Sequence, residues 1–314
     1  MTKSDRAVEL FMTGLNCAQA VFCAFAGDFG IDFETAKKIS VGLGGGVGRM
    51  REVCGTVTGG AMALGLFRGD GDKAAAYPDV QAFCERFRRE NGSIVCRELL
   101  AGVKATAGGA PEARTPEYYR KRPCVELVRM SAAFVEEELM LDRAAKCLSE
   151  GGVAVIPTDT VYGLAAHPAF PEAVSRLYTI KARAEGKPIA LLASDADAVG
   201  KFLGHPLEGR AKELAEAHWP GALTLVTGGE GFRVPDHDWT RRLLARLGGV
   251  LRVTSANMSG ARPAPAAEGA LAEVGLKADL VVDGGVSKGG VPSTVVRVID
   301  GGAVEVLREG AVKI

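Results

Sequence analysis

The segment Val153-Ala-Val-Ile-Pro-Thr-Asp-Thr-Val-Tyr-Gly-Leu164 sets the fold of the C-terminal half of this 314-residue chain. Its first four residues form a short apolar run of strand-like composition, and two hydroxyls, a carboxylate and a phenol follow directly. Open α/β sheets bind their ligands at the ends of strands. The segment therefore predicts a buried strand that ends in a polar, ligand-facing loop. On composition alone, an ordinary strand–helix connection fits equally well.

Similar runs recur after this segment and alternate with stretches of helical periodicity. The expected strands are residues 189–192, 223–226, 251–254 and 280–282, and the expected helices are residues 171–180, 210–217 and 238–247. Strands that alternate with helices predict an α/β domain, and the last segments favour an antiparallel edge. We expect this domain, residues 136–314, to contain a twisted mixed sheet.

The first 135 residues predict a different architecture, an all-α domain. Apolar positions recur at helical spacing in residues 4–12, 17–25, 33–39, 78–89 and 123–138, with glycine clusters such as Gly59–Gly60 between them. Pro78, Pro116 and Pro123 stand where helices are expected to start. No long linker separates the halves, so we expect domains at 1–135 and 136–314, in contact with each other.

The composition of the chain indicates which class of ligand and which cell compartment to expect. Hydrophobic residues make up 47% of the chain, and the formal net charge is zero. Neither half has the basic surplus that gripping a nucleic-acid backbone requires, so a small substrate is favoured. No apolar run approaches the roughly 20 residues that span a bilayer, and the N-terminus lacks a signal-peptide pattern. The sequence therefore predicts no membrane contact and a cytoplasmic protein with reduced cysteines.

Several polar segments of the C-terminal half could bind phosphate. Lys181, Arg183 and Lys187 place three cations within seven residues, and residues 254–260 put hydroxyls and an amide at a strand end. Each segment alone also has a structural interpretation. The cations could stabilise a helix C-terminus, and residues 254–260 could form a turn or a helix cap.

Taken in order, these segments resemble one family. PTDTVYGL, KAR with a following KP, WPGALT, RVPDH, SANMSG, DGG, PSTVV and LREG together resemble the YrdC-like threonylcarbamoyl-AMP synthases, over about residues 139–311. The resemblance implies a YrdC-like α/β fold and a nucleotidyltransferase that makes threonylcarbamoyl-AMP and pyrophosphate from L-threonine, bicarbonate and ATP. It also implies Mg²⁺ on the phosphates and a downstream tRNA-modifying transferase complex that uses the product for threonylcarbamoyladenosine (t6A). Ala184 replaces the proline that often follows the arginine of KAR.

The resemblance also implies roles for individual residues. The set that would hold the triphosphate, with Lys181 and Arg183 as the catalytic cations, is Lys181, Arg183, Ser255 and Asn257. The residues expected to line the substrate and nucleotide pocket are Thr158, Thr160, Tyr162, Lys187, Arg233, Ser293 and Arg308. The reaction needs no covalent nucleophile, so catalysis would be positioning and electrostatic stabilisation.

The N-terminal half carries a second resemblance. Cys17, Cys54, Cys96 and Cys124 are widely spaced, and the segments around Cys17, residues 42–48 and Cys54 resemble the C_GCAxxG_C_C family, described as redox-active, over residues 6–130. The box at Cys54 reads Val-Cys-Gly-Thr and departs from that pattern. A redox dithiol site, a metal ion or an iron–sulfur cluster is one interpretation, and four small buried core residues are the other.

Three alternatives to the synthase remain open at this stage. A related carbamoyl-adenylate-forming enzyme could serve another acceptor, although the acylphosphatase-like and zinc-finger segments that usually accompany it are absent from the sequence. The C-terminal domain could be a double-stranded RNA or tRNA-binding module, or make a weak RNA contact. The cysteine domain could also regulate the synthase through its redox state.

Overall fold

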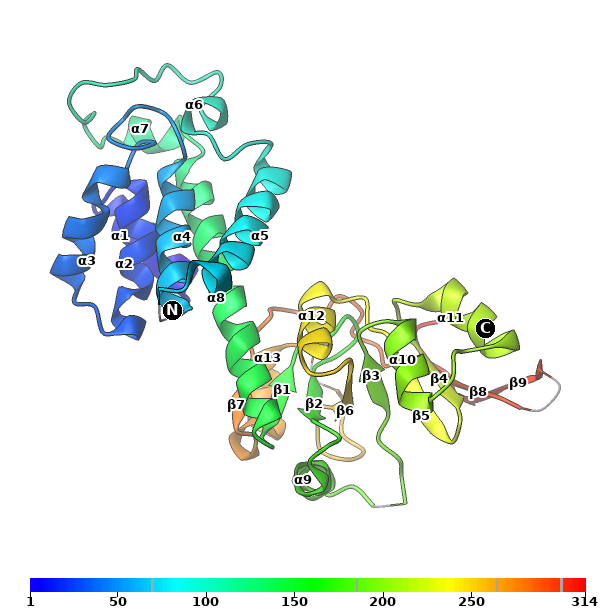
Figure 1. Cartoon of the computed structure of the whole chain (residues 1–314). Coiled ribbons are helices and arrows are strands. Elements are labelled where there is room, and N and C mark those ends of the chain that lie inside the picture. The colour runs from blue at the N-terminus through cyan, green and yellow to red at the C-terminus, as the bar shows by residue number, and fades with distance from the viewer. Residues whose placement is uncertain (69–70, 185, 264, 300–301) are drawn as a thin grey trace. The chain divides into compact units, whose positions relative to one another are not determined.

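The computed structural model describes residues 1–68, 71–184, 186–263, 265–299 and 302–314. The chain divides into two compact units, Met1–Leu139 and Met140–Ile314 (Figure 1). Helix α8 (Cys124–Ser149) contains the division, which agrees with the absence of a linker in the sequence. The helical first unit and the mixed sheet of the second confirm the predicted fold classes. Within the described residues, no helix is both long and apolar enough to cross a membrane.

The first unit is built around α2 (Cys17–Ala26), in which every residue is buried. Its neighbours are α1 (Lys3–Met12), α3 (Phe33–Ser40) and α4 (Gly55–Phe67). The remaining elements are η1 (Gly27–Phe29), η2 (Val41–Leu43), α5 (Lys73–Asn91), α6 (Cys96–Leu99), α7 (Pro116–Arg120) and the first half of α8. Asn16 caps α2 through a capping box with Gln19, which explains why the helix begins at Cys17.

Two sequence interpretations of this unit were wrong. Gly59 and Gly60 lie inside α4 and do not separate helices. A Cβ atom at Gly59 would lie 2.7 Å from the Ala18 carbonyl oxygen, so glycine is needed there for close packing of α4 against α2. Pro78 does not begin a helix but lies within α5, because the side chain of Asp72 accepts a hydrogen bond from the Ala74 amide and starts the helix earlier.

Replacing Gly59 by alanine should destabilise the first unit by about 1–3 kcal/mol, since the added methyl group meets backbone that cannot move cheaply. Gly65 is the matched control, because it lies in the same helix and a Cβ atom there meets nothing within 4 Å. Gly65→Ala should be neutral or stabilising. Hydrogen-exchange mass spectrometry of α2 peptides measures both effects. Equal protection of α2 in the two variants would contradict the packing argument.

The second unit contains a nine-stranded mixed sheet in the order β7-β1-β2-β6-β3-β5-β4-β8-β9. Its strands are β1 (Val153–Ile156), β2 (Gly163–Ala166), β3 (Leu191–Ala193), β4 (Leu223–Thr227), β5 (Glu230–Arg233), β6 (Val250–Ser255), β7 (Leu280–Val281), β8 (Thr294–Val298) and β9 (Val304–Arg308). β1 runs parallel to β7 and antiparallel to β2, and β8 and β9 form the expected antiparallel edge.

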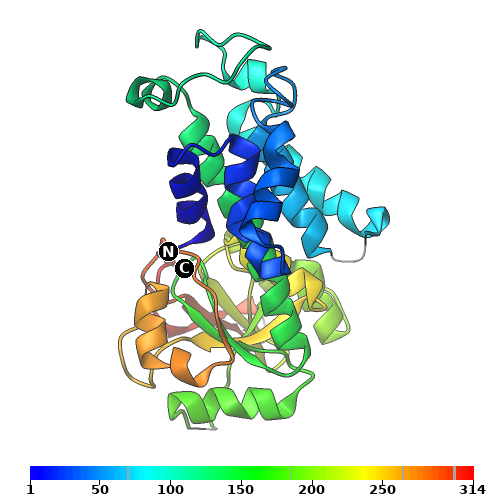
Figure 2. The same cartoon turned by 90° about the vertical axis from the view of Figure 1, so that its left-hand side faces the viewer.

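Helices cover both faces of this sheet. They are α9 (Pro171–Lys181), α10 (Ala196–Leu203), α11 (Gly209–His218), α12 (Asp238–Arg246), α13 (Ala267–Glu273) and the short η3 (Gly275–Lys277). Alternate residues of β1 face opposite sides, as a strand requires. Ala154 and Ile156 pack with α12 and the end of α8, whereas Val153 and Val155 pack with α9 and α13. Figure 2 shows α9, in green, running along one side of the sheet.

Candidate active site

The loop after β1 is tied together by its own hydroxyls. The Thr158 hydroxyl donates to the Val161 carbonyl at 2.7 Å and accepts from the Thr160 amide at 3.2 Å. Thr158 and Thr160 are both almost fully buried. These bonds hold the Thr160 hydroxyl in place, and the loop is therefore a fixed wall of the site.

Arg233, at the end of β5, joins this loop to the far half of the sheet. Its guanidinium donates to the Thr160 hydroxyl at 2.8 Å and to the Gly221 carbonyl at 3.0 Å, and it forms an ion pair with Asp159. Burial lowers the pKa of Arg233, and the Asp159 carboxylate opposes that effect. With 6% of its surface exposed, Arg233 acts as a buried clamp on the loop.

Tyr162 fixes a second loop beside the first. Its phenol donates to the Gly285 carbonyl at 2.6 Å and accepts from the Gly284 amide at 2.9 Å. Burial raises the pKa of Tyr162, so the phenol stays protonated. The same second loop returns to the first, because the Gly289 amide donates to the Asp159 carbonyl and the Gly290 amide to the Thr160 carbonyl, each at 2.8 Å. The DGG segment is thus held against PTDTVYGL.

Lys181 is a buried cation at the last position of α9. Its ammonium group donates to the backbone carbonyls of Ser255 and Asn257 and lies 3.5 Å from the Ser255 hydroxyl. Only 2% of the residue is exposed. Burial, followed by the nearby charge of Arg183, lowers the pKa of Lys181 to about 8. The KAR and SANMSG segments therefore meet at this ammonium group, as the resemblance implied.

Two further arginines are held by backbone carbonyls. Arg183 donates to the carbonyls of Lys187 and Pro188, each at 3.0 Å. Arg308, at the end of β9, donates to the Ser293 carbonyl at 2.6 Å and its hydroxyl at 3.2 Å. Neither arginine is neutralised by these partners, because carbonyls and hydroxyls carry no net charge.

The four cations Lys181, Arg183, Arg233 and Arg308 form one group, in which Arg183 and Arg308 act on their neighbours. After desolvation, Arg183 is the next cause that lowers the pKa of both Lys181 and Arg308. Arg308 in turn adds to the lowering at Arg233, where burial is the main cause. Among the contacts described, Asp159 is the carboxylate that pairs with this group, through Arg233. Such mutual repulsion is relieved by a bound polyanion, so the arrangement favours a polyphosphate ligand.

The side-chain oxygen of Asn257 and the hydroxyl of Ser287 are buried and have no hydrogen-bond partner within the described residues. Asn257 accepts from Lys181 through its backbone carbonyl, and Ser287 lies in the loop that is held against PTDTVYGL. The amide nitrogen of Asn257, in contrast, donates to the carbonyls of Met258 and Ala261 at 2.8 and 2.7 Å. Buried polar atoms normally have partners, so these two mark places where a ligand or water completes the site.

The structure brings most of the predicted site residues together, with some differences from the prediction. Lys187 contributes its carbonyl to Arg183, while its side chain is exposed. Three polar residues of the site were not singled out: Asp159, which pairs with Arg233; Thr224, whose hydroxyl lies 2.8 Å from that of Ser293; and Ser287. Asp159 carried a signal, since it stands between two threonines that were singled out. Thr224 carried a signal too, since it ends the WPGALT segment, whereas Ser287 carried none beyond ordinary polarity.

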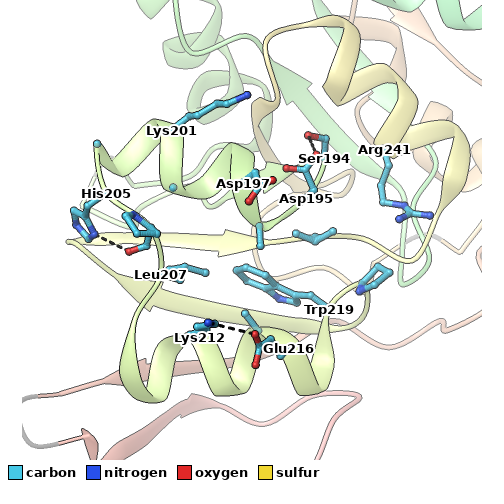
Figure 3. Close-up of a pocket in the computed structure, with 17 residues that line it drawn as sticks. Ser194, Asp195, Asp197, Lys201, His205, Leu207, Lys212, Glu216, Trp219 and Arg241 are labelled. Carbon is cyan, nitrogen blue, oxygen red and sulfur yellow. Dashed lines mark hydrogen bonds and ion pairs between the residues drawn. The ribbon is translucent and has the colours of Figure 1, made fainter.

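A separate cavity of about 910 Å³ lies between α10, α11 and α12 (Figure 3). It is lined by Asp195, Lys201, Trp219 and Arg241 among others, and by none of the four cations described above. Its charges are mixed, with both acidic and basic side chains facing the space. This cavity is therefore separate from the group of four cations, and volume alone does not single out a phosphate-binding site.

In the first unit, the four cysteines of the second resemblance line one cavity of about 320 Å³. All seven cysteines are free thiols, so the four are not paired in this structure. In the part of the chain that is described, no three cysteine, histidine or carboxylate side chains are grouped to hold a metal ion. These residues therefore do not fit a metal ion or an iron–sulfur cluster.

The lowered pKa of Lys181 predicts that this site binds an anion less tightly at high pH. The ammonium group is charged below about pH 8 and neutral above it. We expect the affinity for a nucleoside triphosphate, measured by titration calorimetry, to fall as pH rises through about 8. Lys181→Arg should remove this dependence, because arginine stays charged throughout. Titration of the triphosphate affects both proteins equally, so an unchanged dependence in the variant would show that another group causes it.

Comparison with known families agrees with the two units. Residues 146–310 match the Sua5/YciO/YrdC family model, whose description reads "Telomere recombination". Residues 15–138 match the C_GCAxxG_C_C family model, described as "Putative redox-active protein". Each match falls entirely within one of the two compact units of the structure.

Individual relatives point the same way. The threonylcarbamoyl-AMP synthase of Bacillus subtilis is 34% identical over 174 residues, which cover 50% of each chain, so the present chain spans about half the length of that relative. The enzyme of the same name from Halorhodospira halophila is 34% identical over 155 residues, 45% of this chain and 81% of that protein.

A solved structure extends this comparison to the fold. The crystal structure of Pyrococcus abyssi Sua5 complexed with L-threonine is 29% identical and aligns with a TM-score of 0.51, over 55% of this chain and 54% of that one. The matched motifs, the mixed sheet and the family model together assign the second unit. The chain belongs to the Sua5/YciO/YrdC family.

Proposed function

We propose that the second unit, Met140–Ile314, is a threonylcarbamoyl-AMP synthase that makes its product and pyrophosphate from L-threonine, bicarbonate and ATP. The observation that carries this proposal is a group of four cations, Lys181, Arg183, Arg233 and Arg308. Next to burial, the charge of Arg183 lowers the pKa of Lys181 and of Arg308, and that of Arg308 adds to the lowering at Arg233, which pairs with Asp159. The relatives of that name and the threonine complex of the Pyrococcus protein support the choice of reaction.

The chemistry asks mainly for charge stabilisation. The threonine amine captures bicarbonate as a carbamate, whose oxygen attacks the α-phosphate of ATP while pyrophosphate leaves. Negative charge grows on phosphate oxygens, and preorganised cations stabilise it at little reorganisation cost. Lys181 is preorganised by two carbonyls, and Arg183 and Arg308 by theirs. Mg²⁺ would enter with ATP, held mostly by phosphates and water.

The loop after β1 supplies the walls of the substrate pocket in this proposal. Thr160 and Tyr162 would face threonine and the adenylate, and Thr158 and Arg233 would hold Thr160 in position. Ser255, Asn257 and Ser293 would add polar contacts to the phosphates. The proposal includes a cytoplasmic role in tRNA t6A formation, with the product passed to a tRNA-modifying transferase complex.

The test is pyrophosphate release by the full chain with ATP, Mg²⁺ and bicarbonate, in the presence and absence of L-threonine. We expect release that requires both L-threonine and bicarbonate. Release that ignores threonine but responds to carbamoyl phosphate would indicate a carbamoyl-adenylate-forming enzyme with another acceptor. No release, together with tRNA binding that weakens steeply with salt, would favour an RNA-binding module instead.

A further inference from the structure

The four cysteines of the first unit share a helix-terminal position around one cavity. Cys17 and Cys124 are the first residues of α2 and α8, Cys96 is the first residue of α6, and Cys54 is the N-cap of α4. All four are buried and line the cavity of about 320 Å³. Amide groups and helix dipoles at such positions favour a negative charge.

The same cavity is rich in arginine. Arg49, Arg51, Arg114 and Arg122 line it against a single acidic residue, Glu112. The carboxylate of Glu112 is shared by three of them, at 3.1 Å from Arg49, 3.3 Å from Arg51 and 2.6 Å from Arg122. One carboxylate cannot balance these guanidinium groups, so the cavity carries a net positive charge.

Arg114 and Arg49 each have a buried guanidinium nitrogen without a hydrogen-bond partner within the described residues, and so have capacity left for a ligand. The guanidinium of Arg114 lies over the rings of Phe11, Tyr118 and Tyr119, with distances of 4.8, 4.6 and 5.9 Å to the ring centroids. In Arg114 the nitrogen without a partner is a terminal one. A buried charged donor without an acceptor is costly, and an anion in the cavity would supply the acceptor.

The loop that presents two of the arginines is held in an unusual conformation. Val47, Arg49 and Arg51 all have positive φ angles, between 57° and 69°, which cost energy for residues other than glycine. The loop is anchored next to Cys96, whose amide donates to the Glu52 carbonyl at 2.6 Å. Arg51 is thereby placed with its guanidinium 4.0 Å from the sulfur of Cys96.

Cys17 and Cys124 lie close enough in the cavity for each to change the pKa of the other. Cys17 lowers the pKa of Cys124, and Arg122, Arg114 and Arg51 lower it further, against the effect of burial. Cys124 and burial raise the pKa of Cys17, and burial raises those of Cys54, to about 11, and Cys96. Cys124 is therefore the more acidic thiol of the pair and the one that we expect to attack.

We propose that this cavity is a thiol–disulfide exchange site for a small, negatively charged disulfide, in which Cys124 attacks and Cys17 resolves. This site is independent of the synthase function of the second unit. The arginines select the charge of the substrate, the cavity volume limits its size, and the arginines that line the cavity beside Cys124 favour it as the attacking thiol.

The exchange balances without another reagent. The Cys124 thiolate attacks one sulfur of the substrate, so a Cys124–substrate disulfide forms while the substrate S–S bond breaks and one thiolate leaves. Cys17 passes its proton to that leaving thiolate and attacks the Cys124 sulfur. A Cys17–Cys124 disulfide forms, and the second half of the substrate leaves as a thiolate. The substrate is reduced by two electrons and the cysteine pair is oxidised by two.

The test compares an anionic and a neutral disulfide on the fully reduced full-length protein. The probes are 5,5′-dithiobis(2-nitrobenzoate), which carries two carboxylates, and uncharged 4,4′-dithiodipyridine. We expect a fast phase with the anionic probe that releases two thiolates and leaves a Cys17–Cys124 disulfide in the peptide map. Cys17→Ser should release one thiolate and retain an adduct on Cys124, and Cys124→Ser should lose the fast phase. Glutathione disulfide should give the same products in the wild type.

Charge selection is tested by Arg122→Gln. This change should slow the anionic probe roughly tenfold and the neutral probe much less. If serine variants fail to fold, the peptide map and the probe ratio of the wild-type protein still decide the matter. A fast phase that survives Cys124→Ser, a stable adduct on wild-type Cys124, or equal slowing of both probes by Arg122→Gln would overturn the proposal.

Discussion

We expect Lys181→Met to lower kcat/KM for the proposed threonylcarbamoyl-AMP formation by about a hundredfold or more, because it removes a buried cation of the proposed phosphate site. Methionine keeps most of the length of the side chain and fills most of the same space. It leaves the Ser255 and Asn257 carbonyls without their shared donor, so the loss of the charge should outweigh a modest loss of stability. The measurement is steady-state pyrophosphate release with ATP varied.

Lys201→Met is the matched control for this change. Lys201 is an exposed lysine of α10 that lines the 910 Å³ cavity of Figure 3 and lies outside the cation group. We expect activity within about twofold of wild type, as is usual for a surface substitution. A large loss in Lys201→Met with little loss in Lys181→Met would place the nucleotide in that cavity and contradict the assignment of the site.

Removing the Arg233 side chain destabilises the second unit by about 3 kcal/mol, because Asp159 is then left buried without its partner. The two side chains are only 7% and 13% exposed, so water cannot replace the ion pair. Arg233→Met should also lower activity, since Thr160 loses the donor that positions its hydroxyl. Chemical unfolding followed by tryptophan fluorescence measures the stability change.

A double-mutant cycle separates the ion pair from other effects of these substitutions. Adding Asp159→Asn to Arg233→Met should recover about 1–3 kcal/mol relative to the sum of the single changes, because the orphaned charge is gone. The chain has two tryptophans, Trp219 and Trp239, and both lie in the second unit, so their fluorescence reports on that unit. If the changes in unfolding free energy of the two single variants simply add in the double variant, the proposed ion pair between Arg233 and Asp159 does not hold the loop.

Much of the second unit could be predicted from sequence because its apolar runs are short and continuous. The runs that became β1, β4, β6 and β7 were found within one or two residues of their bounds. β2 was missed because Gly-Leu-Ala-Ala has no β-branched or aromatic residue, and its pairing with β1 and β6 decides its conformation. β5 was missed because Glu-Gly-Phe-Arg looks polar, although two of its residues are buried.

Sequence-based prediction had similar limits in the first unit and in the candidate site. Glycines in α4 and a proline in α5 were taken as boundaries, since local sequence does not show that a neighbouring helix requires glycine. The site residues came from motif order, which places them near strand ends but gives no contacts. Two contacts could be seen only in the structure. Lys181 is buried and donates to two backbone carbonyls, and Arg233 donates to the loop after β1 and does not face solvent.

The most direct test of the proposed reaction is to incubate the protein with ATP, Mg²⁺, L-threonine and ¹³C-bicarbonate and to analyse the products by mass spectrometry. We expect threonylcarbamoyl-AMP that is one mass unit heavier than with unlabelled bicarbonate, formed in equal amount with pyrophosphate, and lost in Lys181→Met. Pyrophosphate release without a labelled threonine adduct, or no release at all from the reduced and the oxidised protein, would contradict it.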